Sequence, residues 1–419
     1  MEETENWHHI LINGKSKRIE VKNPKFKGVK LDDIEDLRPF DKKDEKTGER
    51  KTPTVLDAEN LKRDTYASFF KKPFKNLLVL TGAGSSLDVG GPLMKDLWEA
   101  VENKYTTTGF KAIQDQVKHL SDDINIESLL SKIEGYCKFA DDCEIIIGDK
   151  KKKLSIIKDD IFDIIKAKCD IKQPTNDNFP HKKFLEKLLQ RKLTNPRVKV
   201  FTLNYDLLFE YAANEVNAIV IDGFSFTAPR TFSGRFFDYD IVQREDSKLK
   251  EEDNFIQRVF HLHKLHGSLN WERDEKDYKV RIVDSPKKPL MVYPREAKYE
   301  DSYEQPFFEM MARFQRNLRI NNDTLLICIG YSFNDKHINA AIEEALNQNP
   351  GFRLAVIDPG FNNSKTKSLM EIKKVALESE RIMMVAETFA DFAEHFPEIQ
   401  TYENENQITI NLQNEQSKN

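Results

Sequence analysis

The chain lacks the features by which several classes of protein are recognised. None of its four cysteines forms a Cys-x-x-Cys pair, which argues against a structural zinc site and against a disulfide framework. No apolar run approaches the roughly 18 residues that a membrane span requires. Met1 is followed by Glu-Glu-Thr-Glu rather than by a basic segment and an apolar stretch, so no secretory signal is expected. We therefore predict a cytoplasmic protein with no metal site and no membrane contact.

A large excess of either charge is also missing. The 65 basic and 70 acidic residues nearly cancel, so net charge gives no reason to expect direct nucleic-acid binding. The hydrophobic content of 39% and charged content of 32% are typical of a globular protein with a well-solvated surface. A chain of 419 residues is long enough for two or three domains, or for one larger core with an insertion.

The two ends of the chain are polar. Residues 1–65 are predicted to form a charged N-terminal extension, with a hairpin whose turn is Asn13-Gly14 and a polar linker at 41–51. Residues 401–419 are predicted to form a polar tail. Between them, residues 66–400 are predicted to form the main domain.

Short apolar runs alternate with helical patterns through this domain. The series begins with a strand–turn–helix unit: a short apolar run starts at Asn76, ends in glycines, and is followed by a helical pattern from Leu93. Further helices are expected near 207–216 and 335–346. The later strands are expected at 198–202, 258–265, 290–293, 324–329 and 352–357. Strands that alternate with helices predict an α/β, Rossmann-like and mainly parallel sheet with helices on both faces. Residues 97–195 instead show apolar residues at helical spacing and are predicted to be a helical insertion, with the lysines at 150–153 on a solvated face.

Four motifs follow predicted strands, where α/β sheets bind their ligands. The first, Thr81–Ser86, contains Gly-Ala-Gly, which suits either an ordinary tight turn or the close approach of a pyrophosphate. The second places Asn204 and Asp206 before a helix. Asn204 has the chemistry to orient a ribose hydroxyl or water, and Asp206 either binds a polar group or caps that helix.

The third motif contains three histidines. His261 and His263 lie on one face of a predicted strand and suit buried structural positions, whereas His266 follows the strand and is the better candidate for proton transfer. Gly267 would let a substrate approach closely. No nearby cysteine or carboxylate completes a metal site.

The fourth motif lies late in the chain. Gly330 and Ser332 suit the approach of a nucleotide, and Asp335 suits either a ribose contact or a helix N-cap. Asp358 ends the last predicted strand, a position from which an acidic residue commonly binds an adenosine ribose.

In this order the motifs resemble the sirtuin superfamily, whose members share a Gly-Ala-Gly loop, Thr-x-Asn-x-Asp, a catalytic His-Gly and a late Gly-x-Ser. The variants Leu-Asn-Tyr-Asp, Leu-His-Gly-Ser-x-x-Trp and Gly-Tyr-Ser-Phe-x-Asp look most like bacterial sirtuin-like proteins of antiphage defence. In that group NAD is hydrolysed to nicotinamide and ADP-ribose. The resemblance also implies a homo-oligomer and a HerA-type ATPase partner.

The resemblance assigns roles to particular residues. It implies that residues 66–400 are a sirtuin-like NAD-binding catalytic domain and that His266 is its catalytic histidine. It also implies that Asn204 and Asp206 are catalytic residues that line the nicotinamide-ribose site. The resemblance also implies that NAD, as the substrate, contacts ten residues: Gly82, Ala83, Gly84, Ser85, Ser86, Thr202, Gly330, Ser332, Asp335 and Asp358.

Two alternatives stay open. The first is an NAD-dependent protein deacylase, although the four-cysteine zinc module and the Pro-Asp-Phe-Arg stretch of deacylating sirtuins are missing; residues 91–96 read Gly-Pro-Leu-Met-Lys-Asp. The second is an assembly module that binds NAD or ADP-ribose without turnover. A dehydrogenase is disfavoured, because Leu87 stands where Gly-x-Gly-x-x-Gly requires its third glycine.

Overall fold

The structure is a computed structural model. It describes residues 7–20, 29–31, 48, 55–120, 122–139, 143–148, 150–175, 178–243, 255–292, 305–319 and 323–399. The predicted tail at 401–419 and all but one residue of the predicted linker at 41–51 lie outside this set.

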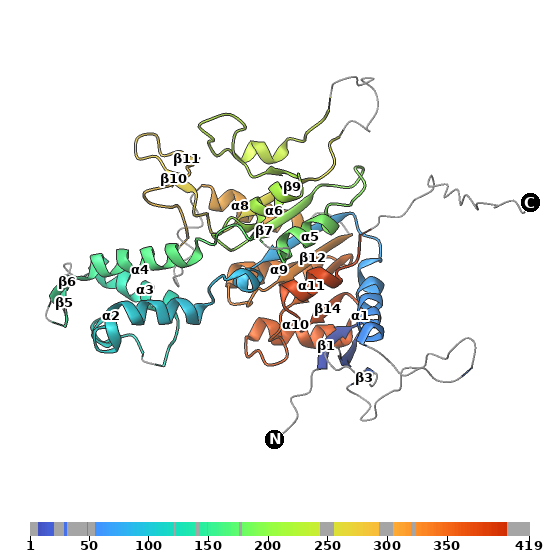
Figure 1. Ribbon diagram of the computed structural model, residues 1–419, viewed down its shortest axis with the longest axis horizontal. Helices are drawn as coiled ribbons and strands as arrows, with labels where there is room; N and C mark the ends of the chain where they lie inside the picture. Colours follow the sequence, from blue (N-terminus) through green and yellow to red (C-terminus); the bar gives the residue numbers. More distant parts are fainter. Residues whose placement is uncertain are drawn as a thin grey trace, which may run out of the picture.

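A ten-stranded sheet forms the centre of the molecule (Figure 1). Its strand order is β3-β2-β1-β14-β13-β12-β4-β7-β9-β8, and the seven strands from β14 to β8 are parallel. These seven are β14 (Ile382–Val385), β13 (Phe352–Ile357), β12 (Thr324–Ile329), β4 (Asn76–Thr81), β7 (Val198–Thr202), β9 (Val259–Lys264) and β8 (Ile219–Ile221). The predicted mainly parallel sheet is confirmed.

The N-terminal segment belongs to the same sheet. Strands β1 (Trp7–Ile12) and β2 (Lys15–Glu20) form the predicted hairpin around Asn13-Gly14, and β3 (Val29–Leu31) pairs with β2. Asn13 and Gly14 both have positive φ, as a two-residue hairpin turn requires. Because β1 pairs antiparallel with β14, the hairpin extends the parallel sheet.

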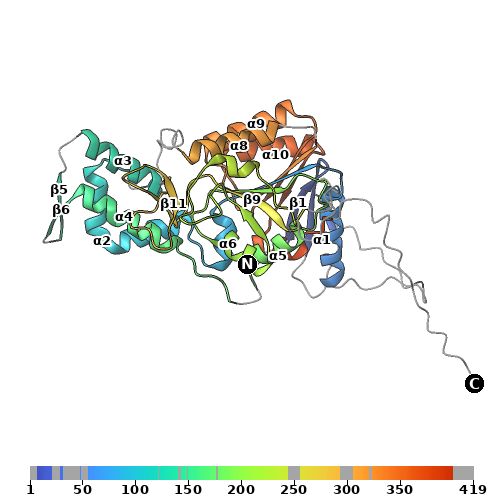
Figure 2. The same ribbon diagram turned by 90° about the horizontal axis from the view of Figure 1, so that it is seen from above.

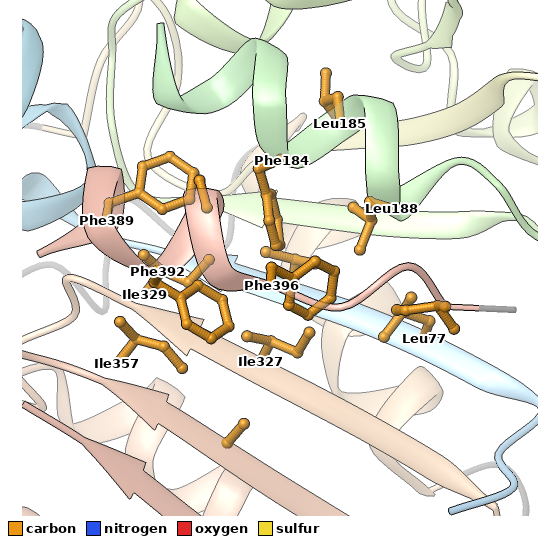
Figure 3. Packing of buried hydrophobic residues seen from close by; sticks show 14 of the residues in the cluster. Leu77, Phe184, Leu185, Leu188, Ile327, Ile329, Ile357, Phe389, Phe392 and Phe396 are labelled. Carbon is orange, nitrogen blue, oxygen red and sulfur yellow. The ribbon is translucent and has the colours of Figure 1, made fainter. Parts of the chain in front are cut away.

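Helices cover both faces of the sheet, as predicted (Figures 1 and 2). One face carries α1 (Val55–Phe70), α5 (Pro180–Leu188), α6 (Leu208–Glu215) and α11 (Phe389–His395), and the other carries α8 (Phe307–Arg319), α9 (Lys336–Gln348) and α10 (Lys367–Glu378). Strand β4 is buried along its whole length, and its alternate side chains enter two different cores. On the α5 and α11 face, the ring centroids of Phe184 and Phe392 lie 6.2 Å apart, and both rings belong to the same core as Leu77 and Ile327 of the sheet (Figure 3).

A helical arm projects from the sheet and has a hydrophobic core of its own (Figures 1 and 2). It consists of α2 (Met94–Gln116), α3 (Ile126–Phe139), the hairpin β5 (Glu144–Ile147) with β6 (Lys150–Lys153), and α4 (Leu154–Cys169). The segment predicted as helical at 97–195 therefore contains a small hairpin, and its last helix, α5, packs on the main sheet instead. The lysine run is a strand whose side chains are mostly exposed, in agreement with a solvated face.

The remaining elements are short. A 3-10 helix, η1 (Ala83–Val89), follows β4. A second one, η2 (Gly234–Asp238), packs Phe237 on His263 of β9. The hairpin β10 (Trp271–Arg273) with β11 (Val280–Ile282) contributes Trp271 and Val280 to the same core. The strand predicted at 290–293 is wrong over its described part, where Met291 makes only an isolated bridge to Gly267. In the described part of the chain, no helix is both long and apolar enough to cross a membrane.

Candidate functional site

The predicted site residues follow the carboxyl ends of five neighbouring strands. Because β4, β7, β9, β12 and β13 are parallel, the segments after them meet at one edge of the sheet. Sequence reasoning placed each motif after a strand, and that placement is confirmed.

The glycine loop after β4 packs directly against the turn after β12. A Cβ atom on Gly84 would lie 2.7 Å from Gly330 Cα, and one on Gly330 would lie 2.3 Å from Ser85 N. The amide of Gly84 donates to Gly330 O at 3.0 Å, and the amide of Ser85 donates to Gly82 O at 2.9 Å. The glycines are therefore required by the contact of two strand-end turns, whether or not a phosphate binds, and phosphate binding by this loop stays a prediction.

Asn204 fastens the segment after β7 to the glycine loop. Its Nδ2 lies 3.0 Å from Gly82 O, 3.1 Å from Ser85 Oγ and 2.9 Å from Ser86 Oγ. The carbonyl oxygen of Gly82 only accepts hydrogen bonds, so the amide nitrogen must face the loop. The side-chain oxygen of Asn204 takes no hydrogen bond from any residue that the structure describes, which leaves an acceptor on a half-buried side chain at the sheet edge.

Asp206 is linked to Asn204 through the hydroxyl group of Ser86. Its Oδ2 accepts from Ser86 Oγ at 2.7 Å, and its Oδ1 accepts from Leu208 N at 3.1 Å, at the start of α6. Because the Ser86 hydroxyl has one proton and donates it to Asp206, its oxygen is left to accept from Asn204. Burial raises the pKa of Asp206, partly offset by the positive charge of Lys264. The N-cap of α6 is Leu207, so the N-cap predicted at Asp206 is wrong by one residue, although Asp206 still accepts from the amide of Leu208 and is linked to Asn204 through Ser86.

Lys264 is a buried cation that sequence reasoning missed. It is 2% exposed at the end of β9, and its Nζ lies 2.5 Å from Asp206 O, 2.7 Å from Ser268 Oγ and 2.9 Å from Glu210 Oε1. Three acceptors satisfy the three protons of the ammonium group. A lysine inside an apolar strand and a glutamate on an apolar helix were the available signal, since buried charges require partners.

His266 points to a different partner. Its Nε2 lies 3.3 Å from Asp335 Oδ2, and the histidine and aspartate side chains are 14% and 9% exposed. Asp335 is also the N-cap of α9, where its side chain accepts from His337 N and Ile338 N. The N-cap prediction is confirmed, and the ribose contact predicted for Asp335 stays a prediction.

The other two histidines of the motif are structural. His263 is 1% exposed and stacks on Phe201 and Phe237, at ring-centroid distances of 4.5 and 4.1 Å. Burial lowers its pKa well below 6.5, and burial also lowers the pKa of His261 to about 3. Both rings therefore stay neutral at physiological pH, which agrees with the prediction of buried structural histidines.

Gly267 is needed for packing rather than for the predicted approach of a substrate. It has φ +90°, and a Cβ atom there would lie 2.2 Å from Leu290 O. The main chain of Leu290 occupies the space next to Gly267 Cα, where the sequence interpretation expected a substrate to approach. This close contact fixes the backbone next to His266.

The remaining predicted residues lie at the same edge. Thr202 is buried and its Oγ1 accepts from Asn204 N at 3.1 Å, while Ala83 and Ser332 are exposed. Asp358 is half-buried, accepts from Gly360 N at 2.7 Å, and has a pKa raised by burial. Their contacts with a nucleotide stay predictions. Within the described ranges, no group of three or more His, Cys, Asp or Glu residues is arranged to hold a metal ion.

The segment that contains most of these residues matches a known domain. Residues 198–378 match the SIR2-like domain. This SIR2-like segment includes Asn204, Asp206, Lys264, His266 and Asp335, and it begins after the helical arm. The glycine loop lies outside the match, but its contacts with Asn204 and Gly330 join it to the segment.

Two solved structures show a weaker similarity. The crystal structure of a Sir2 homologue in complex with NAD has 14% identity and a TM-score of 0.43, with 80% of this chain and 91% of that chain covered. A mutant Sir2 homologue in complex with ADP-ribose has 14% identity and a TM-score of 0.36, covering 75% and 94%. No curated protein matches the chain. The fold assignment rests on the strand order itself.

Proposed function

We propose that this protein hydrolyses NAD at the nicotinamide–ribose bond, giving nicotinamide and ADP-ribose. The observation that carries the proposal is the pairing of an anchored asparagine with a histidine held at the same sheet edge, inside the SIR2-like segment. The choice of NAD as the substrate rests on the motif resemblance to sirtuin-like proteins. Neither Asn204 nor His266 belongs to the hydrophobic cores of the described residues.

Asn204 is suited to fix the ribose or the attacking water. Its amide nitrogen is held by the glycine loop, so the amide oxygen has a set direction. A preorganised acceptor of this kind orients a hydroxyl group without losing side-chain freedom when the substrate binds. Asp206 supports this orientation through Ser86, and Lys264 holds the segment in place.

His266 is suited to accept a proton. In the proposed reaction the bond between C1′ and the nicotinamide nitrogen breaks, and its electron pair leaves with nicotinamide. A water oxygen then bonds to C1′ and loses a proton to His266, which returns it to solvent. General-base assistance of this kind is worth about 10² to 10⁴ in rate. Asp206 is buried and its Oδ2 is bonded to Ser86, so we assign stabilisation of the oxocarbenium-like sugar to the phosphates of NAD rather than to Asp206.

The decisive measurement is release of nicotinamide from NAD by the purified protein, with and without an acylated lysine peptide. We expect nicotinamide and ADP-ribose without peptide, in stoichiometric amounts. Formation of O-acyl-ADP-ribose only when peptide is present would favour the deacylase alternative. NAD binding by calorimetry with no release under any activating condition would favour the assembly module.

The proposal extends to the biological setting implied by the motif resemblance. An NAD hydrolase without control would deplete its own cell, so we propose that activity is governed by homo-oligomerisation and by a HerA-type ATPase partner in antiphage defence. This part rests on the resemblance alone.

A further inference from the structure

The carboxylate of Asp335 is held on two sides. Its Oδ1 accepts from His337 N at 3.1 Å and from Ile338 N at 3.4 Å, at the start of α9. Its Oδ2 lies 3.3 Å from His266 Nε2. Because the helix amides fix one oxygen, the other has a defined direction, and that direction is toward the histidine.

The backbone around Asp335 is fixed as well. The carbonyl oxygen of Asp335 accepts from Tyr331 Oη at 3.2 Å and from Asn339 N at 3.0 Å. Tyr331 is 3% exposed, and its hydroxyl also lies 2.8 Å from Asn339 Oδ1. The turn between β12 and α9 therefore presents the carboxylate on a rigid support.

His266 is supported independently. Its carbonyl oxygen accepts from Val292 N at 2.7 Å, and the next residue, Gly267, forms a bridge with Met291. The pair thus spans the sheet edge from β9 to β12, across the ends of β7 and β4. Such a contact between two fixed turns is not needed to cap α9, since Oδ1 already does so.

We infer that Asp335 is a positioning residue that holds the imidazole of His266 through Nε2 and leaves Nδ1 to take the proton. The inference rests on the proposed function and deepens it. A carboxylate only accepts hydrogen bonds, so it favours the tautomer in which Nε2 carries the hydrogen. The lone pair of Nδ1 is then available to the attacking water or to a ribose hydroxyl. Asp335 acts through His266 and does not itself contact the reacting atoms.

The variant Asp335→Asn separates this role from the helix cap. Asparagine caps helices as well as aspartate does, so the melting temperature should change by no more than about 2 °C. The amide group would present a donor to Nε2 and favour the other tautomer. We expect kcat for nicotinamide release to fall about 10- to 100-fold, because the imidazole loses its charged partner, with KM for NAD within about 3-fold.

A matched control removes a cap that has no histidine partner. Thr388 caps α11 by accepting from Asp391 N. Thr388→Ala should lower the melting temperature by about 2–4 °C while leaving kcat unchanged. If Asp335→Asn also leaves kcat unchanged, Asp335 is only a helix cap and the inference is wrong.

A double-mutant comparison tests whether Asp335 acts through His266. In a His266→Ala background, Asp335→Asn should change the residual rate less than about 2-fold. An equal fall in both backgrounds would mean that Asp335 contacts the substrate directly, which overturns the inference.

The ring nitrogens of ¹⁵N-labelled histidine give a readout that does not depend on turnover. The His266 signals, assigned with His266→Gln, should show hydrogen on Nε2 in the wild type and on Nδ1 in Asp335→Asn. This change without any NAD hydrolysis by the wild type would reject the proposed function and keep the positioning. Hydrolysis with no change in tautomer would do the reverse.

Discussion

His263 and His266 are three residues apart and have opposite environments. His263 lies within β9, stacked between Phe201 and Phe237, and neither ring nitrogen has a hydrogen-bond partner among the described residues. His266 lies beyond the strand, beside the carboxylate of Asp335. One imidazole is therefore a neutral packing group, and the other is the one to which we assign proton transfer.

The difference comes from backbone position rather than from residue type. Within a strand, alternation directs His263 into the core between the sheet and α8, where Phe201 and Phe314 also lie. Beyond the strand, Gly267 turns the chain, so His266 faces the edge where the motifs meet. The position after the strand end is the reason why we assign chemistry to His266 and not to His263, and three substitutions test that explanation.

The largest effect is expected for His266→Ala. It should lower nicotinamide release by at least about 10² because it removes the general base. The side chain is not part of the hydrophobic core, so the circular dichroism spectrum and melting curve should match the wild type. A variant that folds and consumes NAD at the wild-type rate would show that His266 has no catalytic role.

An intermediate effect is expected for Gly267→Ala. The new Cβ atom would meet Leu290 O, and alanine would have to adopt the positive φ of Gly267. The free energy of unfolding should therefore fall by about 1–3 kcal/mol. The displaced His266 should lower kcat by about 10-fold or more. Gly90→Ala is the matched control, because Gly90 has the same φ of +90° and a Cβ atom added there would meet no other atom within 4 Å. Equal effects on stability and rate at both positions would mean that the contact with Leu290 does not hold His266.

The smallest effect is expected for His263→Leu. The pKa of His263 lies well below 6.5 in the folded protein, so below about pH 6.5 the unfolded chain gains a proton that the native state lacks. Stability is therefore full above this pH and falls by about 1.4 kcal/mol per pH unit as the pH drops toward the folded pKa.

His263→Leu should remove this one-proton part of the acid sensitivity, as measured by urea unfolding at pH 7, 6 and 5. His181, whose pKa burial lowers to about 3, should keep its own contribution in both proteins. Nicotinamide release should stay within about 2-fold of wild type. An unchanged pH slope would contradict the neutral, buried assignment of His263.

Much of the fold was predictable because strand signals are local. The runs at 198–202, 324–329 and 352–357 were predicted with the bounds that the structure gives them, since apolar residues between polar breaks define buried parallel strands. Strand β14 was missed, although Ile382–Val385 is apolar, because four residues also fit a buried helical turn. The hairpin β5–β6 was missed because lysine-rich strands carry no alternation of hydrophobic residues.

The position of the candidate site residues after strand ends could be predicted from the sequence, but the contacts between these residues could not. Sequence order placed Asn204, Asp206 and His266 after strands, whereas the pairing of His266 with Asp335 joins residues 69 positions apart across two other strands. The glycines were chosen for the close approach of a phosphate; the structure shows a close approach between the turns that contain Gly84 and Gly330, and phosphate binding stays a prediction. Such contacts depend on the order of strands in the sheet, which the sequence does not state.

Both outermost strands of the sheet, β3 and β8, are only three residues long. Short borders offer few unpaired amide and carbonyl groups to a neighbouring chain, which disfavours growth by strand addition. Contact through side chains on helices or on the projecting arm is therefore favoured over pairing at these two borders for any copies of this protein that associate. That leaves assembly open to control by charge and by partner shape, rather than by continuous backbone pairing.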